Sequence, residues 1–307
     1  MSNQPHRFGI VGIVGRPNVG KSTLLNKVLG QKLAIATPKP QTTRDRIKGI
    51  RTFEDWQVVW VDTPGIHEAQ TKLNRYMVEL AVATMNEVDI AYVLIDAPKA
   101  LERPEKILDE TKRIVTHLES GNKKAFLIPN KVDKVPDKGM LFGLIESFSA
   151  LYPFTEVVPV SAKTGVNVDR LLEVTRSHLP LGQPMFDADE LTDRPMRYIA
   201  KEIVREQLFM TLGQELPYSV AVDILNWEEK GDGLVVIHAN IHVARKSHKP
   251  IVVGKGGSQI KVIGEKSRER IEKLIERKVY LDLRVKVDED WTERPDKLKA
   301  LGYDEMG

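Results

Sequence analysis

The segment Gly15–Ser22 reads GRPNVGKS and holds residue types that can enclose a phosphate group. Its glycines let the backbone approach an anion closely, so that successive N–H groups and the start of the following helix point at it. Lys21 can then reach the β- and γ-phosphates of a nucleotide, and the hydroxyl of Ser22 can hold Mg²⁺. The segment follows an apolar run and opens a helical stretch, as a phosphate-binding loop should. The sequence therefore predicts a nucleoside triphosphate site, with an ordinary glycine turn as the alternative.

Two further polar segments can complete a magnesium site. Asp62 directly follows an apolar run in the sequence DTPG, where a carboxylate can bind Mg²⁺ through water. The N–H of Gly65 can meet the γ-phosphate. The polar loop QTTRD between the two motifs supplies a threonine for the metal, and we favour Thr43 over Thr42. The candidate catalytic residues are Lys21, Thr43 and Gly65.

Base specificity is predicted from the sequence NKVD, residues 130–133. The carboxylate of Asp133 can accept two N–H bonds from the guanine edge, whereas ATP would leave it unpaired and be rejected. Asn130 and Lys131 can brace the base and the loop, and a backbone N–H in Ser161-Ala162-Lys163 can meet the guanine carbonyl oxygen. The candidate nucleotide-binding residues are Gly15, Arg16, Pro17, Asn18, Val19, Gly20, Lys21, Ser22, Thr23, Asp62, Thr63, Pro64, Gly65, Ile66, Asn130, Lys131, Val132, Asp133, Ser161, Ala162 and Lys163.

The elements that must position these motifs alternate apolar runs with helical patterns through the first 180 residues. Such alternation predicts an α/β domain whose mostly parallel sheet is covered by helices on both faces. Nearly continuous apolar runs are typical of strands buried on both faces. The predicted strands are 8–14, 57–61, 90–95, 125–128 and 156–160, and the predicted helices are 22–29, 72–87, 104–118, 140–151 and 168–179.

The rest of the chain predicts a second, smaller α+β domain. The stretch before it contains prolines, a glycine and acidic residues without periodicity, which is typical of a linker. The expected domains are 1–180, a linker 181–195, and 196–307 with a C-terminal tail. For the tail we favour an ordinary terminal helix over docking on RNA through Trp291. Predicted elements of the second domain are a helix 196–209, strands 219–227 and 234–243, a helix 258–277 and a strand 280–287.

A glycine loop, Gly254–Gly257, separates an apolar run from a basic helix in the second domain. A GxxG loop in that position is typical of KH domains, where it clamps the backbone of about four nucleotides. The segment from Arg245 to Lys278 holds 11 Lys or Arg against 4 Glu, a local positive patch suited to phosphates. A solvated helix face is the alternative. The candidate RNA-binding residues are Gly254, Lys255, Gly256, Gly257, Lys261, Lys266, Arg268 and Arg270.

The nucleotide motifs resemble those of the translation-factor-related class of P-loop GTPases. Over nearly all 307 residues the chain is similar to the Era family, through GRPNVGKS, QTTRD, DTPGI, NKVD, SAK, LPYSVAVDI and VVGKGGSQIK. The resemblance implies a P-loop GTPase domain followed by a type II KH domain, which binds 16S ribosomal RNA near its 3′ end during maturation of the 30S subunit. It also implies a monomeric cytoplasmic protein, with peripheral association with the inner membrane in some members.

One residue departs from the pattern of Ras-like GTPases. Ile66 follows DTPG, where those proteins place a glutamine that orients water, and an isoleucine cannot polarise water. The expected hydrolysis is therefore slow. In related GTPases with an asparagine at the position of Asn18, a potassium ion supplies positive charge beside the phosphates, so the resemblance makes Asn18 a candidate K⁺ ligand. A role for Asn18 in stabilising its own loop remains equally open.

Composition limits the remaining possibilities. With 41% hydrophobic and 29% charged residues the chain has ordinary globular composition, and the absence of cysteine excludes disulfides and thiolate sites. No stretch has the roughly 18 apolar residues of a membrane span, and no signal peptide is recognisable. His238, Asn240 and His242 share one face of a predicted strand, where we favour a packed or solvated surface over a metal site.

Three functions are compatible with these features. The nucleotide state can control RNA binding, GTP can be mainly a structural ligand of an RNA-binding protein, or the basic segment can bind anionic lipid. A lipid-binding helix would carry large aromatic residues opposite its basic face. The helix 258–277 instead shows an aliphatic stripe suited to packing on a sheet, which disfavours lipid: Ile260, Ile263, Ile271, Leu274 and Ile275.

Overall fold

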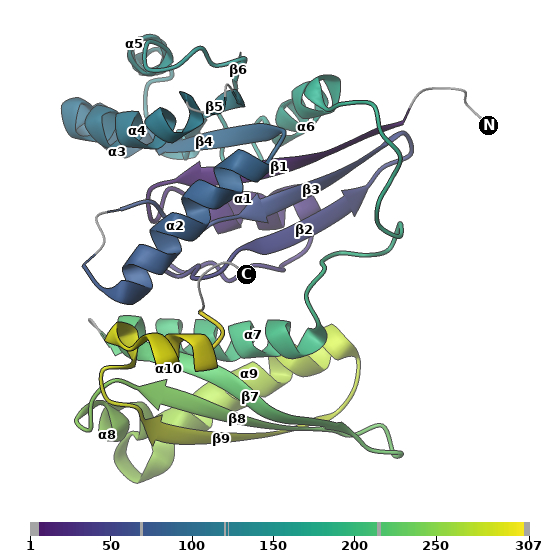
Figure 1. Cartoon of the computed structure of the whole chain (residues 1–307), viewed down its shortest axis with the longest axis vertical. Coiled ribbons are helices and arrows are strands. Elements are labelled where there is room, and N and C mark those ends of the chain that lie inside the picture. The colour runs from purple at the N-terminus through teal and green to yellow at the C-terminus, as the bar shows by residue number, and fades with distance from the viewer. Residues whose placement is uncertain (1–5, 68–69, 120, 122, 214–215, 304–307) are drawn as a thin grey trace. The chain divides into compact units, whose positions relative to one another are not determined.

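The computed structural model describes residues 6–67, 70–119, 121, 123–213 and 216–303. The internal contacts divide the chain into two units, residues 1–68 with 77–193 and residues 69–76 with 194–307. Each unit is built around one β-sheet, and Figure 1 labels their elements.

The sheet of the first unit has the strand order β2–β3–β1–β4–β5–β6, in which only β2 runs antiparallel to its neighbour. Every residue of β3 and β4 is buried, which explains why both strands read as continuous apolar runs. This mostly parallel sheet with its helices confirms the predicted α/β class. The strands are β1 (Arg7–Gly15), β2 (Ile47–Thr52), β3 (Trp56–Asp62), β4 (Ile90–Asp96), β5 (Lys124–Asn130) and β6 (Glu156–Val157), and the helices are α1 (Lys21–Leu29), α2 (Lys72–Glu87), α3 (Ala97–Glu102), α4 (Pro104–Glu119), α5 (Met140–Ser149) and α6 (Val168–His178).

Two elements of this unit were not predicted from the sequence, and one predicted strand is shorter in the structure. The edge strand β2 reads IKGIRT, so its polar residues conceal the two buried isoleucines. The helix α3 has only six residues, too few for a periodic pattern, and begins where the carboxylate of Asp96 accepts a bond from the N–H of Lys99 at 3.3 Å. The predicted strand 156–160 is a strand only over its first two residues, with an isolated bridge at Val160.

The segment expected as a linker is hydrogen-bonded to the first unit over most of its length. The side chain of Gln57 in β3 accepts bonds from the N–H groups of Met185 and Phe186, at 2.8 and 3.0 Å. The N–H of Ile50 in β2 donates to the carbonyl of Leu191 at 2.8 Å. The segment thus covers part of an edge strand that would otherwise expose unpaired backbone groups.

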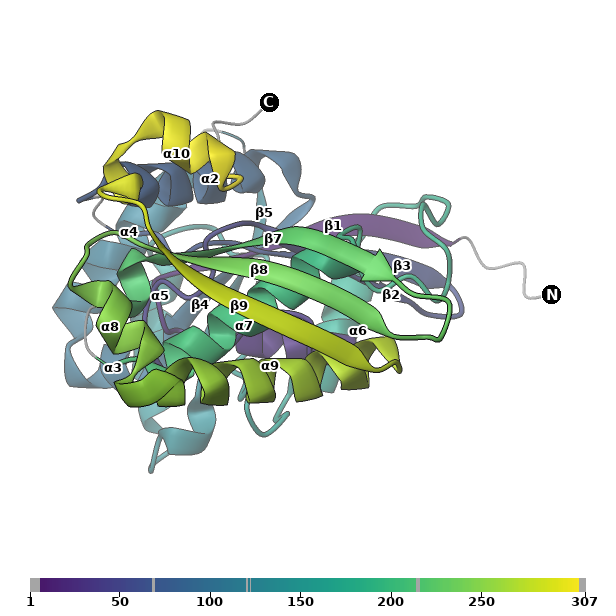
Figure 2. The same ribbon diagram turned by 90° about the horizontal axis from the view of Figure 1, so that it is seen from below.

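The second unit has a three-stranded sheet in the order β7–β8–β9, with β7–β8 antiparallel and β8–β9 parallel. The helices α7 and α9 contact each other and pack on one face of this sheet, as Figures 1 and 2 show. The order of elements agrees with the predicted type II KH topology. They are α7 (Met196–Thr211), β7 (Val220–Glu229), β8 (Val235–Val243), α8 (His248–Val253), α9 (Ser258–Ile275), β9 (Val279–Val287) and α10 (Pro295–Ala300).

The core of the second unit explains the apolar pattern of its elements. Val204 and Leu208 of α7, Val222 of β7, Ile241 of β8 and Ile263 of α9 are all fully buried in one cluster. Each position follows the period of its own element, 3.6 residues in the helices and two in the strands. In the aliphatic stripe of α9, Ile260 and Ile263 therefore face this core and Ile271 is also fully buried, whereas Leu274 near the end of the helix is 39% exposed. Most of the stripe is thus used for packing within the unit.

The C-terminal tail forms a short helix, and Trp291 is part of the packing. Its side chain is fully buried, and its indole N–H donates to the carbonyl of Ser219 at 3.0 Å. Trp291 also stacks with Tyr303, with ring centroids 6.0 Å apart. The alternative role of Trp291 as an RNA contact is therefore excluded, because no face of the indole is exposed.

Candidate functional site

The loop between β1 and α1 owes its shape to residues with a left-handed backbone. Asn18 has φ +63° and Gly20 has φ +105°. A Cβ atom at Gly20 would lie 2.3 Å from the side-chain nitrogen of Asn130, so only glycine fits there. The loop is thus tightly packed against the start of the NKVD segment. This contact brings together two motifs that lie far apart in the sequence.

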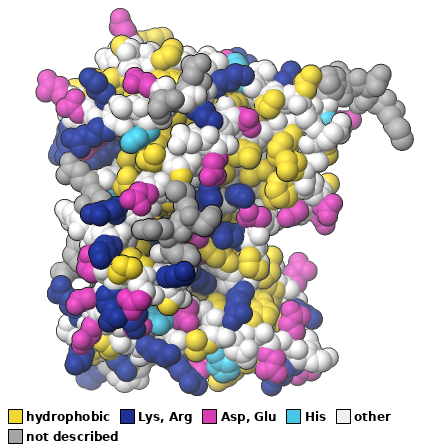
Figure 3. Space-filling view, viewed as in Figure 1, with side chains coloured by type: hydrophobic (Ala, Val, Ile, Leu, Met, Phe, Trp, Pro, Cys, Tyr) yellow, Lys and Arg dark blue, Asp and Glu magenta, His cyan; other side chains and the backbone are white. Residues whose placement is uncertain are grey.

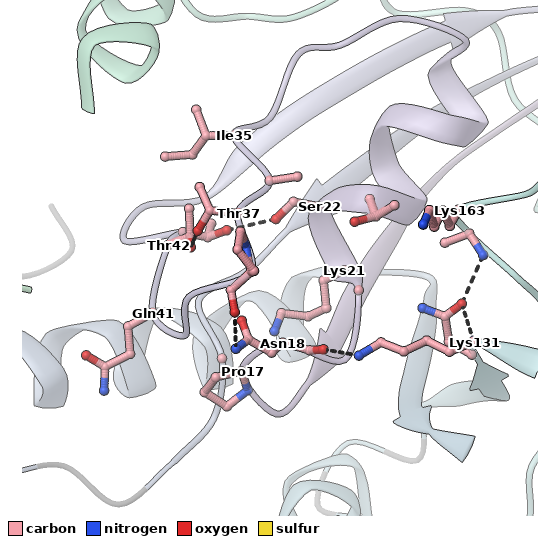
Figure 4. A pocket seen from close by; sticks show the side chains of 18 of the residues that line it. Pro17, Asn18, Lys21, Ser22, Ile35, Thr37, Gln41, Thr42, Lys131 and Lys163 are labelled. Atoms are coloured by element: carbon pink, nitrogen blue, oxygen red, sulfur yellow. Dashed lines mark hydrogen bonds between the residues drawn. The ribbon is translucent and has the colours of Figure 1, made fainter. Parts of the chain in front are cut away.

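A pocket of about 620 Å³ opens at the ends of the parallel strands of the first unit, as the close-up in Figure 4 shows. It brings together most of the residues predicted for a nucleotide, from the loop after β1, from the segment 35–43, and from the segments after β3, β5 and β6. Its lining consists of Pro17, Asn18, Gly20, Lys21, Ser22, Thr23, Ile35, Ala36, Thr37, Pro38, Gln41, Thr42, Thr43, Gly65, Lys99, Asn130, Lys131, Asp133, Lys134, Ala162 and Lys163.

Three oxygen-bearing side chains meet where a magnesium ion is expected. The hydroxyl of Ser22 donates to the carboxylate of Asp62 at 2.6 Å and lies 2.9 Å from the hydroxyl of Thr43. Thr43 also donates to Asp62, at 3.1 Å. By contrast, Thr42 bonds to Thr37 within its own loop, at 2.7 Å. The geometry therefore favours Thr43 over Thr42.

The carboxylate of Asp62 fits a cation. It is fully buried, and burial raises its pKa, although Lys21 and the hydroxyls of Ser22 and Thr43 act in the opposite direction. Its second oxygen, Oδ1, is buried without a hydrogen-bond partner among the described residues. Buried charges are normally paired or bound to metal, so this donor set suits a hard cation such as Mg²⁺.

Lys21 lies beneath the same loop with its charge almost enclosed. Its ammonium donates to the carbonyls of Gly15 and Arg16, at 3.1 and 3.0 Å. Burial lowers the pKa of Lys21 to about 8, although the nearby Asp62 acts to raise it. A phosphate anion at this position would complete the environment of the ammonium group.

The other end of the pocket is braced by Asn130. Its amide nitrogen donates to the carbonyl of Val19 at 2.7 Å, and its oxygen accepts from the N–H of Ala162 at 3.0 Å. Lys131 donates to the carbonyl of Asn18 and to the carboxylate of Asp96, both at 2.6 Å. Three separate motifs are thereby held in one rigid arrangement.

Asp133 lies in the same pocket with its carboxylate oriented by a neighbour. The hydroxyl of Ser161 donates to one carboxylate oxygen of Asp133 at 2.6 Å. An ionised carboxylate can accept further hydrogen bonds on both of its oxygens, so Asp133 can still accept the two N–H bonds that a guanine edge offers. Ser161 itself does not line the pocket, so its part in the site is to position Asp133.

Several predicted residues support the pocket without having side chains in it. Arg16 forms an ion pair with Glu110 of α4 at 2.5 Å, which turns its side chain away from the pocket. Thr63 donates to the carbonyl of Ile13 at 2.8 Å, and Ile66 packs on the core beside β1 and α2. The predicted residues outside the lining are Gly15, Arg16, Val19, Asp62, Thr63, Pro64, Ile66, Val132 and Ser161.

The lining also contains residues that the sequence analysis did not select. The segment Ile35–Pro38 was not selected because its one polar residue, Thr37, lies outside the recognised motifs. Lys99 and Lys134 follow β4 and β5, and a cation just beyond a parallel strand is a signal that could have found them. Both add positive charge to a site predicted to hold phosphates.

Asn18 contacts the segment that carries the threonines. Its amide nitrogen donates to the carbonyl of Pro38 at 3.0 Å, as the dashed line in Figure 4 shows. This bond steadies both loops. It also places the side-chain amide of Asn18 beside a backbone carbonyl, and amide and carbonyl oxygens are ligands suited to a hard cation.

In the second unit, the loop Gly254–Gly257 joins α8 to α9 with three glycines in positive-φ conformations. Gly256 has φ +60°, and a Cβ there would meet no atom within 4 Å. The backbone conformation of the loop therefore favours glycine, and the space beside Gly256 is open. Such a loop allows a phosphodiester backbone to approach closely.

A groove of about 410 Å³ runs between α9 and β9. Lys261 and Arg268 line it, together with Tyr280, whose side chain is 56% exposed. An exposed aromatic ring beside a basic groove can stack on a nucleic acid base. Tyr280 was missed because it lies in a strand pattern, where aromatic residues are common for packing alone.

Two of the predicted RNA-binding cations point elsewhere. Arg270 forms an ion pair with the buried Glu206 of α7, so it fastens the two helices together. Lys266 lies in a separate hollow with Arg270, formed by the face of α9 away from the groove. The prediction of Arg270 as a groove residue is therefore corrected, since positions two residues before and after Arg268 fall on the other side of the helix. Figure 3 shows basic side chains gathered, with some acidic ones, over the end of this unit that holds α8 and the start of α9.

Comparison with known proteins supports both the nucleotide pocket and the KH groove. A family model described as a 50S ribosome-binding GTPase matches residues 10–131, and a KH domain model matches residues 215–292. The protein named GTPase Era from Trichlorobacter lovleyi is 44% identical, over 99% of this chain and all of that one. GTPase Era from Geobacter metallireducens is 46% identical with the same coverage. The chain belongs to the Era family of GTPases.

Solved Era structures agree in fold over both units. The structure of a single-residue variant of Aquifex aeolicus Era bound to GDP·AlF4⁻ matches with a TM-score of 0.91 and 38% identity, covering 97% of this chain and all of that one. An Era structure in complex with MgGDPNP and nucleotides 1506–1542 of 16S ribosomal RNA matches with a TM-score of 0.92 and 38% identity, covering 98% and 100%. The predicted family and fold class are thereby confirmed. Among the described residues, no helix of this Era-family chain is long and apolar enough to cross a bilayer.

Proposed function

We propose that this Era-family GTPase binds the 3′-terminal region of 16S ribosomal RNA in its KH groove and assists assembly of the 30S subunit, under control of bound GTP. The observation that carries the proposal is the full-length similarity to an Era structure that holds MgGDPNP and nucleotides 1506–1542 of that RNA. The open glycine loop and the groove with Lys261, Arg268 and Tyr280 support the same ligand here. Together they offer close approach, positive charge and a stacking surface.

In the nucleotide pocket, the phosphates would lie along the loop Gly15–Gly20 and beside the ammonium of Lys21. Ser22, Thr43 and, through water, Asp62 would hold Mg²⁺, which supplies positive charge between the β- and γ-phosphates. The Oδ1 atom of Asp62 has no hydrogen-bond partner in the part of the chain that the structure describes, which supports this assignment. Asp133, oriented by Ser161, would accept the two N–H groups of guanine. Lys21, Thr43 and Gly65 would stabilise the charge that develops during hydrolysis.

A potassium ion is the finer part of this proposal. The amide nitrogen of Asn18 lies 3.0 Å from the carbonyl oxygen of Pro38. If the amide group turned over, its oxygen and the Pro38 carbonyl would offer two oxygen ligands to the ion. Peripheral association with the inner membrane, which the family resemblance implies, gains no support from α9. Two residues of its aliphatic stripe, Ile263 and Ile271, are fully buried in the KH domain.

The direct test of the nucleotide assignment is release of phosphate from GTP and ATP with Mg²⁺ present. We expect slow hydrolysis of GTP and a preference of about 100-fold or more for GTP over ATP, since ATP would leave Asp133 unpaired. Equal use of ATP would contradict the assignment of the pocket.

A further inference from the structure

The position after DTPG lacks a side chain that could orient water, and the structure shows where Ile66 goes instead. Its side chain packs on a core cluster that includes Val14, Met85 and Val88. Its N–H donates to the carbonyl of Gly15 at 3.2 Å. Hydrolysis of GTP, on which this inference rests as the proposed function, needs a polar group near Gly65 to orient the attacking water.

A pair of polar side chains lies beside Gly65. Gln41 lines the nucleotide pocket, at the end opposite Lys163 in Figure 4. Its side-chain nitrogen lies 2.9 Å from Nε2 of His67, and Nδ1 of His67 lies 2.7 Å from the carbonyl oxygen of Gly65. The loop that carries Thr43 is thus connected to the DTPG segment through an imidazole ring.

The direction of these two hydrogen bonds follows from their acceptors. A carbonyl oxygen can only accept, so Nδ1 of His67 carries the proton and donates to Gly65. In the neutral ring Nε2 is then the acceptor, and the amide nitrogen of Gln41 donates to it. The amide oxygen of Gln41 is left without a partner among the described residues. A carbonyl-type oxygen of this kind can accept a hydrogen bond from a water molecule.

Other polar side chains near Gly65 are already engaged. Ser22 and Thr43 bond to Asp62, and Lys21 bonds to the loop carbonyls. Thr42 donates to the carbonyl of Lys39 at 2.8 Å. Gln41 also has φ +55°, a backbone conformation that non-glycine residues adopt rarely and that recurs at functional sites.

We propose that Gln41 is a catalytic residue that orients the water attacking GTP, and that His67 is a positioning residue that fixes the Gln41 amide. The water oxygen forms a bond to the γ-phosphorus while the bond from that phosphorus to the β–γ bridging oxygen breaks. The electron pair of the broken bond leaves with GDP, and both water protons end on inorganic phosphate. Gln41 accepts a hydrogen bond from the water throughout and neither gains nor loses a proton.

The test compares single-turnover hydrolysis of GTP with the affinity for a non-hydrolysable GTP analogue. Gln41→Ala should lower the hydrolysis rate by about 100-fold and change analogue affinity by less than about 3-fold, because the amide acts on water and not on the nucleotide. His67→Leu should lower the rate similarly. His67→Gln keeps an acceptor for Gln41 and should restore most of the rate, which a purely structural role would not predict.

A double variant tests whether the two residues act together. If His67 acts only through Gln41, then Gln41→Ala with His67→Leu should be no slower than Gln41→Ala alone. Gln31→Ala and His117→Ala, at exposed positions outside the pocket, are the matched controls and should hydrolyse GTP at the wild-type rate.

A folded Gln41→Ala variant with a rate within about 3-fold of wild type would overturn the role of Gln41. Equal rates for His67→Leu and wild type, or no recovery in His67→Gln, would overturn the role of His67. These outcomes concern the variants alone. If the proposed function were wrong, the wild-type protein itself would not hydrolyse GTP or would not bind the 16S fragment.

Discussion

At the scale of single residues, the carboxylate of Asp133 carries the base specificity. It lines the pocket and is oriented by the hydroxyl of Ser161 at 2.6 Å. Asp133→Asn replaces an acceptor with a donor, so it should weaken GTP binding by about 100-fold and improve tolerance of xanthosine triphosphate, whose ring offers an acceptor there. Competition binding of the two nucleotides measures the change.

Asp137→Asn is the matched control for that variant. Asp137 lies nearby in the sequence, but its carboxylate only accepts a bond from the N–H of Gly139 at 2.8 Å and does not line the pocket. Its nucleotide preference should equal that of the wild type. Full retention of GTP preference by Asp133→Asn would show that the guanine contact lies elsewhere.

The cation assigned to Asn18 leads to a second prediction. Hydrolysis of GTP should be faster in potassium than in sodium at equal ionic strength. The reason is that the amide of Asn18 and the neighbouring carbonyl of Pro38 would hold the potassium ion beside the phosphates. Asn18→Ala should abolish that difference. The measurement is phosphate release in each salt, with nucleotide affinity as the control. Equal wild-type rates in both salts, with binding intact, would rule out potassium at this position.

Residue types identified the two sites from the sequence, but side-chain directions were harder to predict. Lys21, Asp62 and Asp133 stand at fixed distances from strand ends, so their positions follow from the chain alone. Arg16 and Arg270 instead pair with Glu110 and Glu206, which lie 94 and 64 positions away in the sequence. A local pattern cannot reveal such partners, and both arginines were therefore assigned to ligands.

At the scale of elements, the glycine loop of the KH domain can be tested with acidic residues. Replacing Lys255 and Gly256 with Asp puts carboxylates where phosphates are expected. RNA affinity should fall and its salt dependence should flatten by about 0.7 of a counterion for each lost single-strand phosphate contact. Binding of GTP should be unchanged, since the loop lies in a different unit from Lys21.

The β7–β8 turn provides a control with the same change of charge. Lys230 and Gly231 are exposed residues of the second unit, and a Cβ at Gly231 meets no atom within 4 Å. Replacing both with Asp should leave RNA affinity near the wild-type value. If the loop variant, folded by circular dichroism, bound RNA with wild-type affinity and salt slope, the KH assignment would be wrong.

A histidine between two carboxylates links β7, β8 and the end of β9. Nε2 of His242 lies 2.5 Å from Asp223, and Nδ1 lies 2.5 Å from Asp288. Burial acts to lower the pKa of His242, but the two carboxylates outweigh it and hold the pKa above the ordinary value. The His238–His242 face is therefore a packed surface with its own ion pairs, in line with the alternative favoured from the sequence.

This raised pKa predicts how the KH domain responds to pH. A histidine whose pKa is raised by folding stabilises the folded state below about pH 6.5, and that contribution is lost as pH rises through the raised value. Hydrogen exchange of the β8 amides should therefore speed up above about pH 6.5, beyond the intrinsic change. His242→Gln should remove this extra dependence. An identical pH profile in wild type and variant would contradict it.

Irregular elements account for most of what the sequence did not reveal about the fold. The strands β3 and β4 were found because burial on both faces leaves an unbroken apolar run. The edge strand β2 is half polar, and its position depends on pairing with β3. Likewise, the segment 181–193 has no periodicity because side chains such as Gln57 and single backbone bonds hold it in place.

At the scale of the whole molecule, the order of domains was predictable because each carries its own motif. Phosphate loops and GxxG loops need glycine for backbone reasons, and that need is visible in the sequence. The groove was only partly predictable, because Tyr280 and the inward turn of Arg270 depend on how α9 meets β9 and α7. The catalytic pair proposed here also required the structure, since Gln41 and His67 come from separate loops.

The central claim is that bound GTP controls RNA binding. The most direct test measures the affinity of wild-type protein for an RNA that spans nucleotides 1506–1542 of 16S ribosomal RNA, with a magnesium-bound GTP analogue and then with GDP. We predict that affinity is higher with the analogue by about 5-fold or more, and that the RNA raises affinity for the analogue relative to GDP by the same factor. Equal RNA affinity in both nucleotide states would reduce GTP to a structural ligand, and absence of RNA binding in either state would contradict the account.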